Sequence, residues 1–310
     1  MCGTLLSTGA LVKAKLDSTR LWTAVITPFD KDDLSVDYYS LEKLLKEQED
    51  AENGVLILGS TGESLSLSLG ERKKIVQFTI ELKLNIPIMV GIPGVNFTET
   101  LSWIDYLETQ KSLAAYLVVT PLYTKPGEEG QYLWFKEILD ASTRECMLYN
   151  IPSRAGISLN IETVRRLLSH PRLWAIKEAS GSATEFVSFV RLNGPKIYCG
   201  DDANMPEYAA LGGYGLVSVA SNIWPLECRK YLELSLSQKL DPDSNKIWKD
   251  SGNSLFLASN PIPVKSLMYG QGKIKSLKTR IPLSHKDFEG CNEVDRAHID
   301  IQNWFSQYTN

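Results

Sequence analysis

The sequence predicts an α/β fold, a (β/α)8 TIM barrel with a C-terminal helical appendage. Eight short apolar runs recur along the chain, and helical patterns lie between them. The starts of the runs are about 20 to 35 residues apart, which leaves room for a loop and one crossover helix each. Their hydrophobicity is continuous rather than alternating, as expected of strands that are covered on both faces.

The predicted strands are residues 21–29, 54–60, 87–93, 116–121, 146–152, 173–180, 196–202 and 215–222. Between two of them, Ser68 and Glu71 form a capping box that predicts a helix start. Another helix is predicted from Ser35 toward Gly54. After about residue 235 the pattern contains only helical stretches, interrupted near residues 260–263.

These elements divide the chain into a flexible N-terminal extension over 1–17, a catalytic barrel over 18–235 and a C-terminal helical domain over 236–310. The first segment has a short apolar patch but no charged start before it, so we do not expect a signal peptide. An open doubly wound sheet is the main competing fold. Its usual Gly-x-Gly-x-x-Gly turn is missing, because the first run ends in Thr27-Pro28-Phe29.

Composition narrows the range of partners. The 310 residues are 43% hydrophobic and 23% charged, with a net charge of -4. This gives no basic face for nucleic acid, and no run approaches the roughly 18 apolar residues of a membrane span. We therefore expect small-molecule partners, or further copies of the chain, and neither nucleic acid nor membrane.

The cysteines and histidines do not suggest a metal or disulfide framework. The five cysteines are far apart and never in a Cys-x-x-Cys pair, which favours a reducing, cytoplasmic setting. The three histidines are isolated, so we expect no metal site and no histidine-based triad. Proton transfer would then fall to Tyr, Lys, Asp or Glu.

Lys177 is the leading candidate for chemistry. It lies near the C-terminal end of an apolar run and shares its strand face with Ala175 and Ala179, which leave room around the amine. A neutral lysine amine can attack a carbonyl to form a Schiff base. Alternatively, the side chain reaches solvent from the strand end or pairs with a carboxylate such as Glu178.

Further polar groups follow other predicted strands. Ser60 and Thr61 follow the second, Tyr123 the fourth, and Tyr149 and Arg154 lie on or after the fifth. Taken singly, a tyrosine is commonly a core residue and an arginine a surface ion pair. In a barrel, however, the C-terminal strand ends meet at one mouth, so we expect these groups to converge with Lys177.

Six motifs carry a family resemblance, which covers about residues 18–285. They are Gly59-Ser-Thr-Gly-Glu-Ser, Tyr149-Asn-Ile-Pro-Ser-Arg-Ala-Gly, Ile176-Lys-Glu-Ala-Ser-Gly, Gly200-Asp-Asp, Leu211-Gly-Gly-Tyr-Gly and Asn260-Pro-Ile-Pro-Val-Lys. In this order they resemble the dihydrodipicolinate synthase branch of the pyruvate-dependent aldolase and N-acetylneuraminate lyase superfamily.

The resemblance implies a condensation of pyruvate with L-aspartate 4-semialdehyde in the diaminopimelate and lysine pathway, giving 4-hydroxy-tetrahydrodipicolinate. It implies that Lys177 forms the imine with pyruvate and that Tyr149 shuttles protons, while Ser60 and Tyr123 complete a relay to solvent. No metal or organic cofactor is then needed. The family tyrosine matching Tyr123 is donated across a tight dimer, so a homodimer or a homotetramer is expected.

For substrate binding, the resemblance places Thr61 beside the pyruvate carboxylate, Arg154 at the carboxylate of the second substrate and the backbone around Val217 in the lining of the site. The main alternative is a sister aldolase that joins pyruvate to a sugar aldehyde or sugar acid, against which Arg154 argues. A barrel that only binds a keto acid, and a phosphate-binding barrel, are weaker alternatives.

The sequence departs from the family pattern at several positions. Ser60 replaces the usual threonine of the synthases, a change also typical of the sialic acid lyases, but it keeps a hydroxyl. Leu122 replaces a tyrosine of many bacterial members, and Leu69 and Arg72 replace histidines of the lysine-sensitive pattern.

We therefore predict weak or absent feedback inhibition by lysine, because Leu69 and Arg72 replace the histidines of the lysine-sensitive pattern and Leu122 replaces a tyrosine of many bacterial members. Initial rates measured against increasing lysine should stay nearly constant. An inhibition curve that saturates at low lysine concentration would contradict this prediction.

Overall fold

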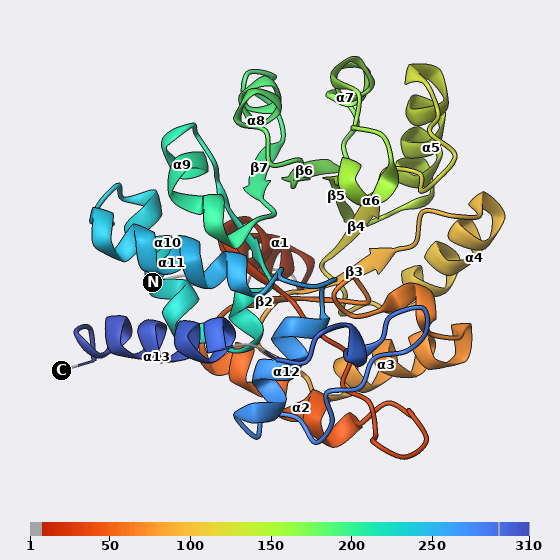
Figure 1. Ribbon diagram of the computed structural model, residues 1–310. Helices are drawn as coiled ribbons and strands as arrows, with labels where there is room; N and C mark the ends of the chain where they lie inside the picture. Colours follow the sequence, from red (N-terminus) through yellow and green to blue (C-terminus); the bar gives the residue numbers. More distant parts are fainter. Residues whose placement is uncertain (1–7, 291, 310) are drawn as a thin grey trace, which may run out of the picture.

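A computed structural model describes residues 8–290 and 292–309 as a closed barrel of eight parallel strands surrounded by helices (Figure 1). Every strand pairs with its neighbours in chain order, and β8 closes the barrel on β1. The predicted fold class is therefore confirmed. The strands are β1 Leu21–Ala24, β2 Gly54–Ile57, β3 Ile88–Ile92, β4 Ala115–Val119, β5 Glu145–Asn150, β6 Leu173–Glu178, β7 Lys196–Cys199 and β8 Gly215–Ser218.

Each observed strand falls within or close to its predicted run, but most are shorter at the C-terminal end. The polar residues there leave the ladder and form loops, which is where barrel enzymes place their working groups. The helices before the C-terminal domain are α1 Thr8–Ser18, α2 Tyr38–Asp50, α3 Leu69–Glu81, α4 Phe97–Glu108, α5 Glu128–Ala141, α6 Pro152–Ala155, α7 Ile161–Leu167, α8 Ala183–Val190, α9 Met205–Ala210 and α10 Pro225–Leu236. Short 3-10 turns are η1 Ser64–Ser66, η2 Asp202–Asn204, η3 Ala220–Asn222 and η4 His285–Asp287.

Local signals explain where the helices begin. The capping box at α3 is formed as predicted, since the Ser68 side chain accepts from the Glu71 backbone and Glu71 reaches back to Ser68. The helix expected from Ser35 begins later, at Tyr38, because Asp37 is its N-cap and accepts from the Ser40 backbone N–H.

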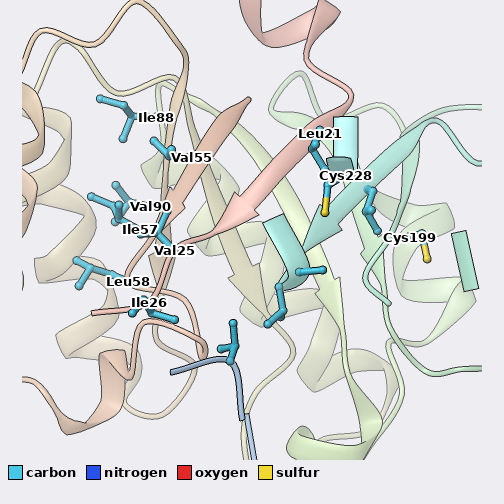
Figure 2. Packing of buried hydrophobic residues seen from close by; sticks show 14 of the residues in the cluster. Leu21, Val25, Ile26, Val55, Ile57, Leu58, Ile88, Val90, Cys199 and Cys228 are labelled. Carbon is cyan, nitrogen blue, oxygen red and sulfur yellow. The ribbon is translucent and has the colours of Figure 1, made fainter. Parts of the chain in front are cut away.

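The hydrophobic core has two layers, separated by the strands. Helix-facing side chains pack between the barrel and the helices, and Figure 2 shows part of this layer, including Val55, Ile57 and Val90. Alternate residues point into the barrel, where Ala175, Met147 and Tyr198 belong to an interior cluster. Within the described part of the chain, no helix is long and apolar enough to cross a membrane.

The N-terminal segment differs from the predicted flexible extension over its described part, where α1 is helical. Its end covers the N-terminal face of the barrel. Leu16 joins the interior cluster, and the Asp17 carboxylate accepts from Trp174 Nε1 at 3.2 Å and pairs with Lys196 at 2.8 Å. The two strands β6 and β7 that carry these partners are thereby tied to α1.

The helices after the barrel, here called the C-terminal domain as in the predicted division of the chain, are α11 Pro242–Ser254, α12 Ile262–Gly270 and α13 Asn292–Ser306. In Figure 1, α11 lies at the left beside α10, α13 at the lower left and α12 at the lower centre, and the loop after α12 runs beside α3. Arg280 in that loop makes a two-pronged contact with Glu71 of α3, at 2.9 Å and 2.5 Å. This pair lowers the pKa of the Glu71 carboxyl from 4.5 to about 2.

A lowered pKa in the folded state means that the Glu71 contribution to stability is present above pH 4.5 and is lost as the pH falls through about 2. We predict that Glu71→Gln lowers the free energy of unfolding at pH 7 by about 1 kcal/mol, a discounted figure because the pair is partly exposed. Urea unfolding at several pH values measures the difference, which should vanish near pH 2. The exposed pair of Glu162 and Arg165 provides the control, since Glu162→Gln should have almost no effect. An effect of Glu71→Gln that does not change with pH would contradict this prediction.

Candidate active site

Five of the six polar side chains predicted from the strand ends converge at the C-terminal mouth of the barrel. A cavity of about 400 Å³ is lined by Ser60, Thr61, Tyr149, Arg154 and Lys177. These residues come from the loop after β2, from β5, from α6 and from β6. The cavity meets the usual description of a small-molecule site, a concave space with a few convergent polar groups.

Lys177 lies at the base of this cavity. Its residue is only 5% exposed, and its Nζ lies 4.4 Å from the centroid of the Tyr149 ring. Strand pairing explains the closeness, because Tyr149 and Lys177 are direct partners in the β5–β6 ladder. Within residues 8–290 and 292–309, the Lys177 amine has no ion pair within 4 Å, and Glu178 points to the other side of the strand. The pairing with Glu178 that the sequence left open is therefore not observed.

Space around the lysine depends on Gly200, which follows β7. A Cβ atom at this position would lie 2.8 Å from Lys177 Cε and 3.1 Å from the Glu178 carbonyl oxygen. Only glycine therefore leaves the lysine stem in its observed place. The neighbouring Asp201 also lines the cavity, and burial raises the pKa of its carboxyl.

Two side chains in the cavity have hydrogen-bond donors that are suited to binding an anion. The Thr61 hydroxyl accepts from Asn260 Nδ2 at 2.9 Å, which leaves its own hydrogen free to donate. The Arg154 guanidinium donates to the Asn260 carbonyl oxygen at 3.4 Å and has no carboxylate within 4 Å among the described residues. Its remaining donors can receive a carboxylate.

Two of the predicted site residues lie apart from the rest. Tyr123 is 92% exposed and lines neither this cavity nor the adjoining one. Val217 is buried in the barrel interior, and Val219, two residues later, lines the cavity instead. Ser60 does line the cavity, but no side-chain hydrogen bond joins it to Tyr149 or Tyr123 in the part of the chain that the structure describes.

The prediction did not foresee that the C-terminal domain forms a wall of the site. Asn253, Phe256 and Asn260 line the same cavity. The motif beginning at Asn260 could have indicated this contact, but no spacing rule connects Asn260 to Thr61, 199 positions earlier. The buried pair of Lys265 and Glu63, with Nζ and Oε1 2.5 Å apart, was missed for the same reason.

Candidate metal ligands are sparse. Among the described residues, no three His, Cys, Asp or Glu side chains gather in a way that could hold a metal ion. Cys146, Cys199 and Cys228 are buried free thiols, and the other two cysteines lie outside the described residues.

The closed parallel barrel is that of the (β/α)8 enzymes, and a nearly buried lysine beside a tyrosine at its C-terminal mouth is an arrangement suited to Schiff-base chemistry. Comparison with known proteins specifies the family. Residues 17–299 match the dihydrodipicolinate synthetase family. The chain therefore belongs to this family.

Individual relatives agree with this assignment. The chain is 44% identical over 290 residues to the 4-hydroxy-tetrahydrodipicolinate synthase of Wolbachia pipientis subsp. Culex pipiens, covering 93% of this chain and 98% of that protein. It is 44% identical over 291 residues to the Francisella tularensis subsp. novicida synthase, with the same coverage.

Solved structures are similar as well. The synthase from Methylacidiphilum fumariolicum SolV superposes with a TM-score of 0.85 at 28% identity, over 93% of this chain and 97% of that one. The Acinetobacter baumannii dihydrodipicolinate synthase, solved in complex with pyruvate, has a TM-score of 0.82 at 30% identity, over 92% and 99% of the two chains.

The role of Gly200 can be tested by Gly200→Ala. We predict a fall of about tenfold or more in the rate of any reaction at Lys177, because the added Cβ displaces the lysine stem and a misplacement of about 1 Å can cost up to a hundredfold. The readout is the rate of covalent labelling by pyruvate and borohydride. Gly70→Ala is the control, since a Cβ there has its nearest contact at 4.0 Å. Equal labelling rates in both variants and the wild type would contradict the prediction.

Proposed function

We propose that this protein condenses pyruvate with L-aspartate 4-semialdehyde to give 4-hydroxy-tetrahydrodipicolinate, as a carbon–carbon bond-forming lyase of the lysine and diaminopimelate pathway. The observation that carries the proposal is the pairing of Lys177 with Tyr149 in a family whose named relatives are 4-hydroxy-tetrahydrodipicolinate synthases. The covalent imine takes the place of a cofactor.

The first stage activates pyruvate. The Lys177 amine attacks the ketone carbon, and loss of water gives the imine. Tyr149 lies beside the amine and can supply the proton that leaves with the hydroxyl. The Thr61 hydroxyl, whose hydrogen is free to donate, is suited to the pyruvate carboxylate. Removal of a proton from the methyl group then converts the imine to the nucleophilic enamine.

The second stage joins the substrates. The enamine carbon attacks the aldehyde carbon of L-aspartate 4-semialdehyde, and the aldehyde oxygen takes a proton to become the 4-hydroxyl. Arg154 holds the carboxylate of this substrate through donors that no protein carboxylate occupies. The amine of the substrate then attacks the imine carbon, the ring closes and the Lys177 amine leaves. Lys177 is regenerated, so the step balances without an oxidant or a metal.

Tyr123 enters the proposal through a second copy of the chain. Its backbone has φ +68°, a strained value for a tyrosine, and its side chain is 92% exposed. A second cavity of about 290 Å³ adjoins Ser60 and Tyr149 and is lined largely by apolar side chains. In a symmetric homodimer, alone or paired into a homotetramer, each copy's Tyr123 could fill the other's cavity and complete a relay from Tyr149 through Ser60.

No carboxylate of the described residues contacts the Lys177 amine, because Glu178 is turned to the opposite face of β6 and bonds to Asn150 and Ser180 there. In this proposal the backbone around Val217 does not touch substrate. It supports Val219, which lines the cavity.

The test is intact mass after borohydride reduction in the presence of pyruvate. We predict one adduct, the mass of pyruvate less water plus two hydrogens, on the wild type and none on Lys177→Ala. Lys74→Ala, which removes an exposed lysine from α3, should be labelled like the wild type. Untreated enzyme supplied with aspartate semialdehyde should then form product, followed through a coupled reductase. An adduct without turnover favours the sister aldolases, and no adduct removes the Schiff-base mechanism.

A further inference from the structure

A buried polar network lies directly behind Tyr149 and Lys177. Asn150 and Glu178 are both fully buried, and Asn150 Nδ2 donates to Glu178 Oε2 at 2.5 Å. The same nitrogen donates to Glu185 Oε2 of α8 at 2.9 Å. One amide therefore serves two carboxylates, and neither carboxylate has a cation within 4 Å in the described chain.

The position of the network follows from strand geometry. Tyr149 and Lys177 are partners in the β5–β6 ladder, and the next pair is Asn150 and Glu178. Because successive side chains of a strand point to opposite faces, the first pair faces the cavity and the second faces α8. The register of this ladder shifts between Cys146 and Met147. The Asn150–Glu178 hydrogen bond therefore fixes the pairing of β5 with β6 after the register shift, at the end of the ladder where Tyr149 and Lys177 lie.

The network also holds the loop that carries Arg154. Asn150 Oδ1 accepts the Leu159 backbone N–H at 2.8 Å, and the Ser158 hydroxyl donates to Glu185 Oε1 at 3.2 Å. These contacts anchor the far end of the segment that begins with α6. A single buried cluster thus connects the strand of Tyr149, the strand of Lys177 and the loop of Arg154.

Each polar atom of the Asn150 and Glu178 side chains has a partner. The remaining Glu178 oxygen accepts the Ser180 backbone N–H at 2.6 Å. Burial raises the pKa of the Glu178 carboxyl. Removing one member leaves buried partners without hydrogen bonds, and such networks tend to break as a unit.

We propose that Asn150, Glu178 and Glu185 are positioning residues, whose hydrogen bonds hold Lys177 against Tyr149 and bring Arg154 over the same cavity. This inference rests on the proposed function and deepens it. The three residues line no part of the cavity, so they act through Tyr149, Lys177 and Arg154 rather than by touching substrate.

The geometry allows the hydrogen-bond donors and acceptors of the network to be exchanged by substitution. In Glu178→Gln, an amide replaces one oxygen, so either the Asn150 bond or the Ser180 bond is lost. The triple variant Asn150→Asp with Glu178→Gln and Glu185→Gln reverses the donors and acceptors. The new carboxylate at 150 accepts from both glutamine amides and from Leu159, while the glutamine oxygens still accept from Ser180 and Ser158.

The experiment compares wild type, Glu178→Gln and the triple variant by the rate of pyruvate labelling, by kcat and by thermal unfolding. We expect kcat and the labelling rate to fall about tenfold or more in Glu178→Gln, and to recover at least half of the loss in the triple variant. Thr23→Val is the control for stability alone, because Thr23 is fully buried on β1, across the barrel, and bonds to Gln48 at 2.6 Å. It should lower the melting temperature with little change in kcat.

Unchanged kcat and labelling in Glu178→Gln, or a triple variant no faster than the single one, overturns the proposal. If Glu178→Gln does not fold, Ser158→Ala decides, since it removes only the loop contact with Glu185. We expect that variant to raise KM for aspartate semialdehyde several-fold with unchanged pyruvate labelling, and an unchanged KM overturns the proposal. Failure of the proposed function is seen separately, because the wild type itself would then give no adduct.

Discussion

The buried ion pair between Lys265 of α12 and Glu63 is the contact on which the geometry of the site depends. Both side chains are fully buried and their charged atoms are 2.5 Å apart. An unpaired charge in such a place is costly, so neither residue can keep its position without the other. Glu63 belongs to the loop that carries Ser60 and Thr61, and its second oxygen accepts the Arg280 backbone N–H at 2.9 Å. The loop after β2, which lines the cavity, is therefore held by residues from the C-terminal part of the chain.

The helices added after the barrel are consequently also a structural part of the site. Asn260 makes the connection directly, because its side chain donates to Thr61 and its carbonyl oxygen accepts from Arg154. Asn260 thus contacts both Thr61 and Arg154, the two side chains that are suited to binding the carboxylates of the two substrates. A rigid link of this kind favours catalysis, since both reactants must be held in one orientation for the carbon–carbon bond to form.

Lys177 is closely surrounded by other residues, but among the described residues its amine has no ion pair. Gly200 leaves room for the stem, Tyr149 lies beside the amine, and the acidic neighbour Glu178 is held on the opposite face by Asn150 and Ser180. The alternation of side chains along β6 achieves this separation, because residues 177 and 178 must point to opposite faces. The Lys177 amine is thereby kept free of the carboxylate that follows it in the sequence.

The eight-stranded barrel, the α3 capping box and most of the polar residues at the mouth could be predicted from the sequence. These follow from local rules, since continuous apolar runs with helices between them specify parallel strands, and parallel strands in a barrel gather their C-terminal ends. The family motifs added candidate roles for Lys177, Tyr149 and Arg154. The folded structure was needed to show that α1 is helical where an extension was predicted, that Val219 rather than Val217 lines the cavity, and that Tyr123 lies outside it. It also decided which distant residues meet, such as Asn260 with Thr61 and Lys265 with Glu63, because such pairs depend on how helices dock after the barrel closes and no periodicity encodes them.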